Sequence, residues 1–496
     1  MNISQILFNT VKKAPKHPAI VFKNENLTYQ ELAEQVKEKA AGLKKYGLQD
    51  GSHVALMAAN KPEYAIAYFS LLALGAIVVP INPTFKASEI IYILNDAEAE
   101  AIIVDEAGIG EVKKAVNELS TVKQIFSLPP EDSLIHWEAV NGDPADFWPE
   151  PKAPQDDAQI IYTSGTTGKP KGAIITHGNL EWMTQTSADI LELTKEDRVL
   201  VVLPLFHAYA KLQGLLQCVF IGCTIYLEER FIPDVILKRM AEERITVFFG
   251  VPTMYTMFVH SPRIKELDFS SLRKAGSGGA SLPVEILEKV KTEMGVEIGE
   301  GYGQTESTVM ISCFPNESVK KAGSVGLPLP GIELKIVDAS EREVPAGEVG
   351  EIIFKGPNTM KGYYKKEEET NETIKDGWLY TGDLGRQDEH GYLYIVDRKK
   401  DMIIRGGYNV YPREIEEVLY THPDIVECAV VGESDPVFGE EVAAYIVSRS
   451  EGNPEEIAAF CKQRLAHYKV PRRIYFLKEL PKTTTGKILK TPLRKK

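Results

Sequence analysis

The sequence predicts an α/β fold with a large N-terminal domain of mostly parallel βαβ sheets flanked by helices, a β-rich subdomain, and a small α+β C-terminal domain. Three observations lead to this class. Helix and strand patterns alternate through residues 28–105 and again through residues 160–302, as in βαβ units. Short apolar strands separated by glycine turns dominate residues 323–396. The pattern then changes abruptly at the charged segment 397–401, in a chain whose 496 residues exceed one ordinary domain.

The first helix is predicted to follow Thr28. This residue forms a capping box with Glu31, and the helical pattern that follows ends near Gly47. A strand is expected over residues 54–60. Pro62 then marks the first turn of a second helix.

The most apolar stretch, residues 65–80, is predicted to be a buried helix followed by a buried strand. Glycine and proline interrupt it, and it is shorter than a membrane span needs. Residues 87–97 and 99–105 continue the alternation as a helix and a strand. The acidic, proline-bearing segment 127–159 is expected to be a surface excursion.

The composition describes an acidic globular protein, with a formal net charge of −13 and 44% hydrophobic residues. This charge disfavours general binding to nucleic acid or to anionic membranes. Residues 1–14 have no apolar stretch, so no signal peptide is predicted. The cysteines lie neither in CxxC nor at metal-ligand spacing from a histidine, and they are expected to be buried thiols in a reducing cytoplasm. They are Cys218, Cys223, Cys313, Cys428 and Cys461.

A loop rich in glycine and hydroxyl residues carries the most informative chemical signal. The string YTSGTTGKPKG spans residues 162–172 and follows an apolar strand. Its backbone N–H groups, hydroxyls and two lysines favour a cradle for the β- and γ-phosphates of ATP. It is not a Walker A loop, because G-x-x-x-x-G-K-[ST] is absent. By composition alone, a solvated turn would fit equally well.

The segment GYGQTE, residues 301–306, offers a second set of groups. Its glycines allow the backbone to approach a ligand closely. Tyr302 presents a flat face for a base, although a single tyrosine is more often an ordinary core or surface residue. Thr305 can donate to a phosphate, and Glu306 is a hard oxygen ligand suited to Mg²⁺.

The string at residues 162–172 resembles the signature of the adenylate-forming (AMP-binding) superfamily, which includes acyl-CoA synthetases, fatty-acid–CoA ligases, coumarate–CoA ligase and luciferases. Similar segments recur in order at LPLFHAYA, GVPTMY, GSGGASLP, GYGQTE, YTGD, DRKKDMI and PKTTTGK, so the resemblance covers nearly the whole chain. It implies that residues 1–396 form the N-terminal AMP-binding domain with the acyl and ATP sites. Residues 397–401 would be a hinge, and residues 402–496 a mobile C-terminal domain with the catalytic lysine.

The resemblance implies a nucleotide site to which both domains contribute. Tyr302 would be the adenine platform, Asp383 would accept hydrogen bonds from the ribose hydroxyls, and Arg398 would also contact the nucleotide. The expected set is Thr163, Ser164, Gly165, Thr166, Thr167, Gly168, Lys169, Lys171, Gly278, Gly279, Ala280, Gly301, Tyr302, Gly303, Gln304, Asp383, Arg398 and Lys487.

The expected reaction needs no nucleophilic side chain, because the substrate carboxylate attacks the α-phosphorus in line. By resemblance, Lys487 bridges that carboxylate and the α-phosphate and stabilises the transition state. Thr305 would contact the α-phosphate. Glu306 and Thr167 would hold Mg²⁺, which offsets the charge of the pyrophosphate leaving group. By the same resemblance, His207 lies at the acyl site and the thiol entry. It is expected to gate this entry or to orient the reactants there.

The acyl pocket is expected, by alignment of the similar segments, to be lined by His207, Tyr209, Gln213, Val251, Gly278, Gly303, Val309 and Met310. These are mainly apolar or small, so an uncharged tail is expected, and medium- or long-chain fatty acids are favoured. The segment FHAYA has no acidic residue, which disfavours amino-acid activation, whereas its similarity to coumarate–CoA ligases keeps aromatic acids open. Lys211 could pair with a second carboxylate of a dicarboxylic acid, or be an ordinary solvated or salt-bridged lysine.

Two steps compete for the same site. Lys487 must be inside for adenylation, yet a thiol must later reach the same carbonyl. The resemblance implies that the small domain rotates between the steps about Lys400, although residues 397–401 could also be a plain charged linker. The channel for coenzyme A would then involve Arg405, Gly406, Gly407 and Tyr408.

The sequence thus predicts an AMP-forming acid–thiol ligase that makes an acyl-AMP, releases pyrophosphate and transfers the acyl group to coenzyme A. ATP, Mg²⁺, coenzyme A and a carboxylic acid are the expected ligands. No nucleic acid and no transmembrane segment are expected, and the protein would be a cytoplasmic monomer or homodimer. An aryl- or dicarboxyl-CoA ligase and an acyl-AMP ligase that loads a carrier-protein thiol are alternatives. A catalytically dead ATP-binding module is disfavoured, because the set of Lys487, Glu306 and Asp383 is complete.

Overall fold

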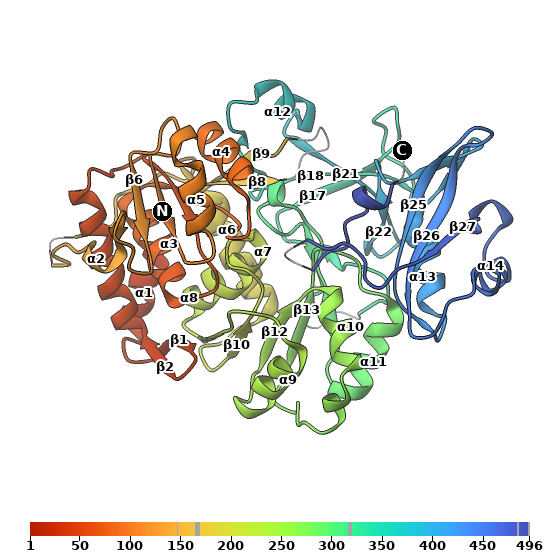
Figure 1. Cartoon of the computed structure of the whole chain (residues 1–496), viewed down its shortest axis with the longest axis horizontal. Coiled ribbons are helices and arrows are strands. Elements are labelled where there is room, and N and C mark those ends of the chain that lie inside the picture. Colours follow the sequence, from red (N-terminus) through yellow and green to blue (C-terminus); the bar gives the residue numbers. More distant parts are fainter. Residues whose placement is uncertain (146, 164–168, 316–319, 484–485, 495–496) are drawn as a thin grey trace.

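The computed structural model describes residues 1–145, 147–163, 169–315, 320–483 and 486–494. Figure 1 shows a large body that contains the N-terminus and a smaller C-terminal unit, coloured blue, beside it. Parallel sheets with helices make up most of the large body. The predicted fold class is therefore confirmed.

One half of the large body is built on an eight-stranded sheet with the order β19-β9-β8-β4-β3-β5-β6-β7. The run from β8 to β7 is parallel, whereas β9 and β19 are antiparallel. Its strands are β3 (His53–Met57), β4 (Ile77–Pro80), β5 (Ala101–Val104), β6 (Gln124–Ser127), β7 (Ile135–His136), β8 (Asp157–Thr163), β9 (Lys171–Thr176) and β19 (Gly362–Tyr363).

The other half is built on a seven-stranded sheet with the order β14-β13-β12-β10-β11-β1-β2, in which only the pairing of β1 with β2 is antiparallel. Its strands are β1 (Pro18–Phe22), β2 (Glu25–Thr28), β10 (Arg198–Val201), β11 (Thr224–Leu227), β12 (Val247–Gly250), β13 (Lys274–Ser277) and β14 (Ile298–Glu300). In parallel sheets, ligands bind beyond the carboxyl ends of the strands. Here β13 and β14 lead into GSGGASLP and GYGQTE, two segments that sequence analysis singled out.

Helices cover and separate these sheets. They are α1 (Gln5–Lys13), α2 (Tyr29–Lys45), α3 (Pro62–Leu74), α4 (Ala87–Asp96), α5 (Ile109–Ala115), α6 (His177–Leu191), α7 (Ala208–Lys211), α8 (Gln217–Ile221), α9 (Pro233–Glu242), α10 (Pro252–His260) and α11 (Val284–Met294). A π-helical turn (Leu212–Leu216) joins α7 to α8. Among the described residues, no helix has both the length and the apolarity to span a membrane.

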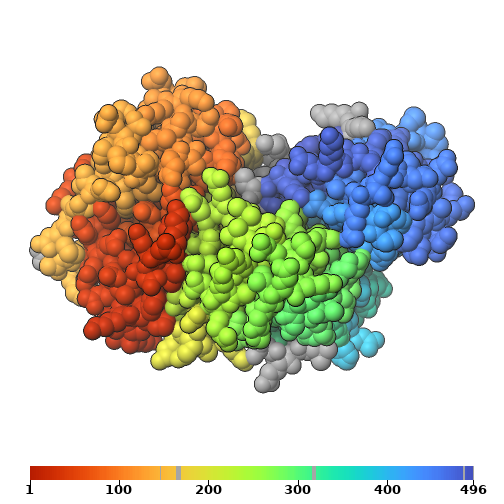
Figure 2. Space-filling model, turned by 60° about the horizontal axis from the view of Figure 1, so that its bottom comes forward, coloured from red at the N-terminus to blue at the C-terminus, as the bar shows by residue number. Residues whose placement is uncertain are grey.

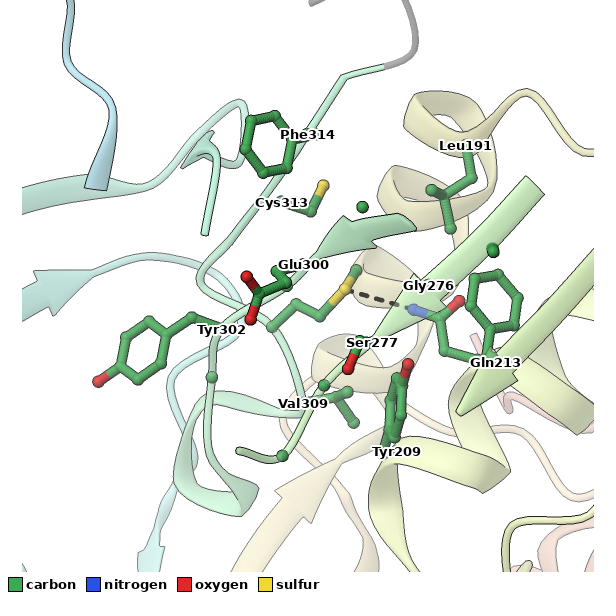
Figure 3. Close-up of a pocket in the computed structure, with 18 of the residues that line it drawn as sticks. Leu191, Tyr209, Gln213, Gly276, Ser277, Glu300, Tyr302, Val309, Cys313 and Phe314 are labelled. Atoms are coloured by element: carbon green, nitrogen blue, oxygen red, sulfur yellow. Dashed lines mark hydrogen bonds between the residues drawn. The ribbon is translucent and has the colours of Figure 1, made fainter. Parts of the chain in front are cut away.

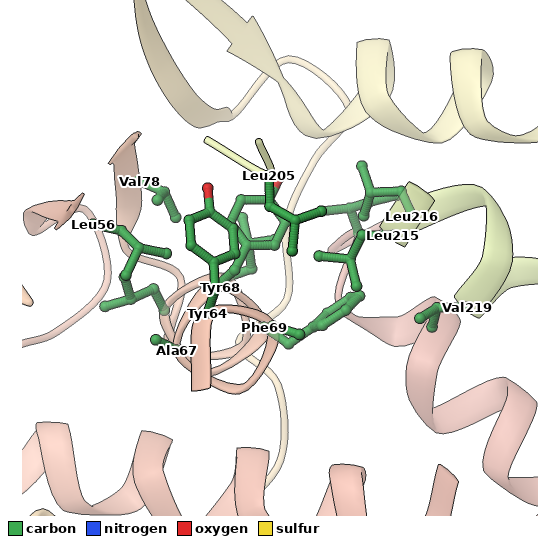
Figure 4. Close-up of a cluster of buried hydrophobic side chains, with 14 of the residues drawn as sticks. Leu56, Tyr64, Ala67, Tyr68, Phe69, Val78, Leu205, Leu215, Leu216 and Val219 are labelled. Carbon is green, nitrogen blue, oxygen red and sulfur yellow. The ribbon is translucent and has the colours of Figure 1, made fainter. Parts of the chain in front are cut away.

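Helix α3 lies at the centre of the main core. Every residue of it from Tyr64 to Leu74 is buried, as expected for residues 65–80. In Figure 4 its aromatic side chains lie between Leu56 and Val78 of the eight-stranded sheet and the side chains of the α7–α8 segment, including Leu216. A helix that is apolar all round needs such cover on all sides.

Local signals of the sequence are realised at the predicted ends. The Thr28–Glu31 capping box is present at the start of α2, and Gly47 follows its last turn with φ of 85°. Segment 127–159 differs from the expected surface excursion. Trp137 and Phe147 in this segment are buried, and the amide of Gly142 donates to the carbonyl of Glu38 in α2 at 2.9 Å. Because most residues of this segment are polar or proline, its composition does not indicate that a few apolar residues anchor it to the large body.

The β-rich part contains α12 (Glu367–Thr373) and a sheet of β17 (Glu333–Val337), β18 (Gly350–Lys355), β20 (Ile374–Lys375), β21 (Trp378–Gln387) and β22 (Leu393–Arg398), with β15 (Ser312–Cys313) paired to β16 (Leu327–Pro328). The C-terminal unit contains β23 (Ile403–Arg405), β24 (Tyr408–Val410), α13 (Pro412–Tyr420), β25 (Ile425–Asp435), β26 (Gly439–Ser448), α14 (Pro454–Lys462) and β27 (Arg473–Phe476). Residues 399–402 link the two sheets. The domain boundaries themselves stay a prediction.

The C-terminal unit packs against the middle of the large body. Figure 2 shows its blue surface beside the green segment that includes α10 and α11. Arg449 and His260 meet across this junction, with Nη2 of the arginine 2.6 Å from Nε2 of the histidine. The turn before Lys487 also touches α10, because a Cβ on Gly486 would lie 2.7 Å from Oγ1 of Thr253. Lys487 is thereby held against the large body.

Candidate active site

A cavity of about 150 Å³ runs along the ends of β13 and β14 and reaches Lys487. Figure 3 shows its walls, with Leu191 and Phe314 at one end. The structure brings together many of the residues singled out by sequence. Those that line the cavity are His207, Tyr209, Gln213, Gly278, Gly279, Gly301, Tyr302, Gly303, Gln304, Thr305, Val309, Met310 and Lys487.

Lys487 lies against a glycine whose backbone only glycine adopts readily. Gly279 has φ of 84°, and a Cβ there would lie 2.6 Å from Cε of Lys487. The lysine is presented by a tight turn in which its amide donates to Oγ1 of Thr483 at 3.1 Å. Burial lowers the pKa of Lys487 to about 8, with a further lowering by Arg398 and an opposing effect of Asp383. A buried amine with this pKa, which forms no ion pair within the described part of the chain, is suited to bind an anion.

A polar cluster centred on Asp383 borders the cavity. The hydroxyl of Tyr302 and the amide nitrogen of Gln304 both donate to Oδ2 of Asp383, at 2.8 and 2.7 Å. Nε of Arg398 lies 3.4 Å from Oδ1, because the two residues are opposite each other in the β21–β22 ladder. Burial, and then the Asp383 charge, raise the pKa of Tyr302 well above its usual value. The predicted ribose and base residues therefore form one hydrogen-bonded unit.

His207 precedes α7 at the cavity wall. Burial lowers its pKa to about 4, and the charges of Lys487 and Lys211 act in the same direction. The imidazole is therefore neutral at neutral pH. The neutral ring can orient a reactant or gate the cavity by hydrogen bonding and packing, but it does not supply a positive charge.

Glu306 belongs to a separate polar cluster at the end of β8. Its Oε1 accepts hydrogen bonds from the hydroxyl of Tyr363 at 3.0 Å and from Oγ1 of Thr163 at 3.3 Å. Nζ of Lys171 lies 4.3 Å from the centre of the Tyr363 ring. One carboxylate with two hydroxyl groups beside it fits Mg²⁺ held mainly by phosphate oxygens and water. Among the described residues there is no group of three or more His, Cys, Asp or Glu side chains for a metal held by protein alone.

Some predicted residues lie outside the cavity or outside the described part. Val251 is buried beside Gly486, and Ala280 is exposed on the loop after β13. Nζ of Lys169 lies 5.7 Å from the centre of the Tyr92 ring. Ser164, Gly165, Thr166, Thr167 and Gly168 lie outside the described residues, and with them the predicted Thr167 contact to Mg²⁺. Their roles stay predictions.

The segment expected to line the coenzyme A channel lies on the C-terminal unit. Arg405 is buried, and its Nε and Nη2 donate to Glu441 at 2.6 and 2.9 Å. Tyr408 is 59% exposed, and the carbonyl of Lys400 accepts from Nη2 of Arg494 at 3.3 Å. The Arg405 side chain therefore ties β23 to β26 in this arrangement. The described residues that line the cavity do not include Lys400, Arg405, Gly406, Gly407 or Tyr408.

Two site residues carried no signal in the sequence. Tyr363, the partner of Glu306, lies 57 positions away in a segment without a recognised pattern. Glu300 lines the cavity and accepts from the amide of Leu282 at 2.9 Å. Burial raises the pKa of Glu300 to about 7, against the opposing charge of Arg413 in the C-terminal unit. Only the packing of distant segments reveals these two residues.

Comparison with known proteins identifies the family to which this chain belongs. The family described as AMP-binding enzyme matches residues 7–364, and the AMP-binding enzyme C-terminal domain matches residues 414–487. The chain belongs to the AMP-binding enzyme family. The resemblance and the enzyme class, an AMP-forming acid–thiol ligase with ATP and coenzyme A as co-substrates, are thereby confirmed.

Relatives of this AMP-binding enzyme differ in the acids that their names mention. It is 37% identical to a long-chain-fatty-acid–CoA ligase of Bacillus subtilis, over 99% of this chain and 94% of the relative. It is also 37% identical to a feruloyl-CoA synthase of an Amycolatopsis species, over 98% and 97%. The crystal structure of the anthranilate CoA ligase AuaEII with anthranoyl-AMP is similar with a TM-score of 0.94, at 28% identity, over 99% and 96% of the two chains.

Proposed function

We propose that this AMP-binding enzyme couples ATP cleavage to the formation of a CoA thioester from a monocarboxylic acid with a compact, uncharged body. The cavity beyond Lys487 carries this proposal. The whole cavity, which also includes Tyr302, Gln304 and Lys487, has a volume of about 150 Å³, so the part left for the acid is no larger than an apolar cavity of another protein that accepts one benzene ring. The lining side chains of Leu191, Phe249 and Phe314 are apolar. An aromatic acid or a medium-length aliphatic acid fits these dimensions.

Longer fatty acids, which sequence analysis favoured together with medium-length ones, are the second candidate. The cavity walls also include Arg273 and Lys320, and both side chains are exposed. A long aliphatic tail could therefore leave the cavity at this end and run along the surface. Such a tail would gain less from burial than the part inside the cavity.

In the first proposed step, an oxygen of the acid attacks the α-phosphorus of ATP, the bond to the β-phosphate bridge breaks, and pyrophosphate leaves. Lys487 would hold the acid and the α-phosphate together and offset their negative charges. Asp383 and Tyr302 would bind the ribose and the base. Mg²⁺, held by Glu306 and phosphate oxygens, would supply charge compensation for the leaving group.

In the second proposed step, the sulfur of coenzyme A attacks the acyl carbonyl, the bond to AMP breaks, and a proton leaves the thiol. The thiol needs the space that Lys487 fills. We propose that the C-terminal domain, residues 402–496, turns about residues 397–401 with Lys400 as the pivot. The location of this pivot between the sheets that contain β22 and β23 supports the proposal.

Two further proposals concern the setting of the enzyme. All five cysteines are buried free thiols, which supports a reducing compartment such as the cytoplasm. A monomer or homodimer is proposed from the sequence, and light scattering of the purified protein would measure it.

The test is release of pyrophosphate and formation of CoA thioester with a panel of acids: benzoates, cinnamates, hexanoate to decanoate, and palmitate. Compact acids should have higher kcat/KM than palmitate. The Lys487→Ala variant is the control, and it should lose adenylation by roughly 10²-fold or more. Absence of AMP with every acid would contradict the proposed function. If thioester forms only on a phosphopantetheinylated carrier protein, the carrier protein and not coenzyme A is the acceptor.

A further inference from the structure

The acyl cavity contains two buried polar side chains with an atom that lacks a hydrogen-bond partner among the described residues, the hydroxyl of Ser277 and the amide of Gln213. Gln213 is 2% exposed and lines the cavity. Within the described part of the chain, no group donates a hydrogen bond to its Oε1. Its amide nitrogen has only a weak acceptor, Sδ of Met310 at 3.3 Å, drawn as the dashed line in Figure 3.

The position of Gln213 is fixed by packing. It lies in the π-helical turn between α7 and α8, and such turns are frequent at functional sites. The next residue, Gly214, lies so close to β10 that a Cβ on it would be 2.8 Å from the methyl groups of Val201. The helix cannot move towards the sheet, so the amide stays in the cavity wall.

A glutamine at this place is costly unless a ligand pairs with it. An unsatisfied buried amide oxygen costs about 1–3 kcal/mol, whereas a leucine or methionine of similar size at this place in the cavity wall would not have that cost. The other glutamine of the same helix, Gln217, is also buried and unsatisfied at both amide atoms among the described residues, but it does not line the cavity. Gln213 therefore differs from Gln217 by facing the space for the acid.

The depth of the amide defines where the partner group sits. Tyr209 packs against Gly278 beside the reaction centre, since a Cβ on Gly278 would lie 3.2 Å from the Tyr209 ring. Gln213 is four positions further along the chain, about one helical turn away from Tyr209. A substituent at that depth belongs to the far side of the acid's body and not to the carbon next to the carboxylate.

We propose that Gln213 is a specificity-determining residue that selects acids with a hydroxyl group on the far side of a compact body, as in a hydroxylated aromatic acid. The inference rests on the proposed function. The hydroxyl donates to Oε1 of Gln213. Because a hydroxyl also accepts, it would pair with the amide in either orientation of the side chain. A plain hydrocarbon body leaves the amide unpaired in the complex.

The experiment compares pairs of acids that differ by one hydroxyl, such as 4-hydroxybenzoate with benzoate and 4-hydroxycinnamate with cinnamate, by kcat/KM for pyrophosphate release. The wild-type enzyme should prefer the hydroxylated member by roughly 10–100-fold, the ratio expected when a buried polar group would otherwise stay unpaired. Gln213→Leu should reduce this ratio to below about threefold, while it keeps or gains activity with the plain acids.

Gln217→Leu is the matched control, because it removes an equally buried amide from the same helix outside the cavity. It should leave the ratio unchanged. An equal or reversed preference in the wild-type enzyme would overturn the inference even if a variant failed to fold, and so would a Gln213→Leu enzyme with the wild-type ratio. Activity with plain acids but without a hydroxyl preference would refute only this inference, whereas no pyrophosphate release from any acid would refute the proposed function.

Discussion

The contact between Gly279 and Lys487 allows a test in which a single methyl group displaces the lysine proposed to be catalytic. In Gly279→Ala the new Cβ would lie 2.6 Å from Cε of Lys487. Ordinary contact begins at 3.4 Å, so Cε of Lys487 must move by about 0.8 Å, and the amine attached to it moves as well. The lysine tip is flexible, so the clash is relieved by moving the lysine and not by unfolding the loop.

The two consequences of this change differ in size. Placing alanine at φ of 84° costs about 1–2 kcal/mol of stability. Moving a group of the reaction centre by about 1 Å can reduce the rate by about 10²-fold. Adenylation should therefore fall far more than the stability loss explains, and KM for ATP should change little.

The assay is acid-dependent exchange of pyrophosphate into ATP, with thermal unfolding measured on the same samples. Gly295→Ala provides the matched control, because Gly295 also has positive φ, 69°, and a Cβ there meets no atom within 4 Å. That variant should lose similar stability and keep its exchange rate. A Gly279→Ala enzyme within about threefold of wild type, or an equal loss in Gly295→Ala, would refute the reasoning.

Four further predictions use the other contacts of the site. Tyr302→Phe removes a donor to Asp383, so KM for ATP should rise roughly 2–10-fold with kcat little changed; an unchanged KM would contradict the ribose assignment. The kcat/KM for adenylation, which reports the free enzyme, should decline as the pH rises through about 8, because Lys487 then loses its proton, and a flat kcat/KM profile to pH 9 would contradict a charged-lysine mechanism. Burial lowers the pKa of Lys211 to about 7, so the unfolded chain binds more protons between pH 7 and 10.5, and the free energy of unfolding should rise over that window. Lys211→Met should be more stable at pH 6 and show a smaller rise than the wild-type protein, as urea unfolding would measure. Lys400→Pro should spare pyrophosphate release but reduce thioester formation; equal loss in both would indicate misfolding.

The sequence predicts best those features that depend on neighbouring residues. The capping box at Thr28 and the buried helix α3 follow from spacing and apolarity within one segment. Residues in the GYGQTE loop are brought together for the same reason, since a short loop after a strand keeps them close. The contact of Asp383 with Tyr302 spans 81 positions, and it became an expectation only through the resemblance to a family.

Features that depend on packing between distant segments could not be predicted. Arg405 has the residue type expected of a channel wall, but its partner Glu441 lies on another strand, and the pair is buried. Lys211 was expected to face a second carboxylate or to be solvated or salt-bridged. It is instead fully buried, with Nζ 4.9 Å from the centre of the Tyr68 ring and no hydrogen-bond partner among the described residues. Neither outcome has a signature within a short window of sequence.

The lowered pKa of Lys487 also bears on the order of the two chemical steps. Burial of this amine without an anion costs free energy, which is why the pKa falls to about 8. The junction that holds it contains exposed polar contacts such as Arg449 with His260, and exposed contacts of this kind are worth little. We therefore expect the anionic reactants to supply much of the stabilisation of the closed arrangement. Under the rotation proposed above, the departure of pyrophosphate would remove most of that negative charge and would thereby favour the departure of Lys487 before the thiol arrives.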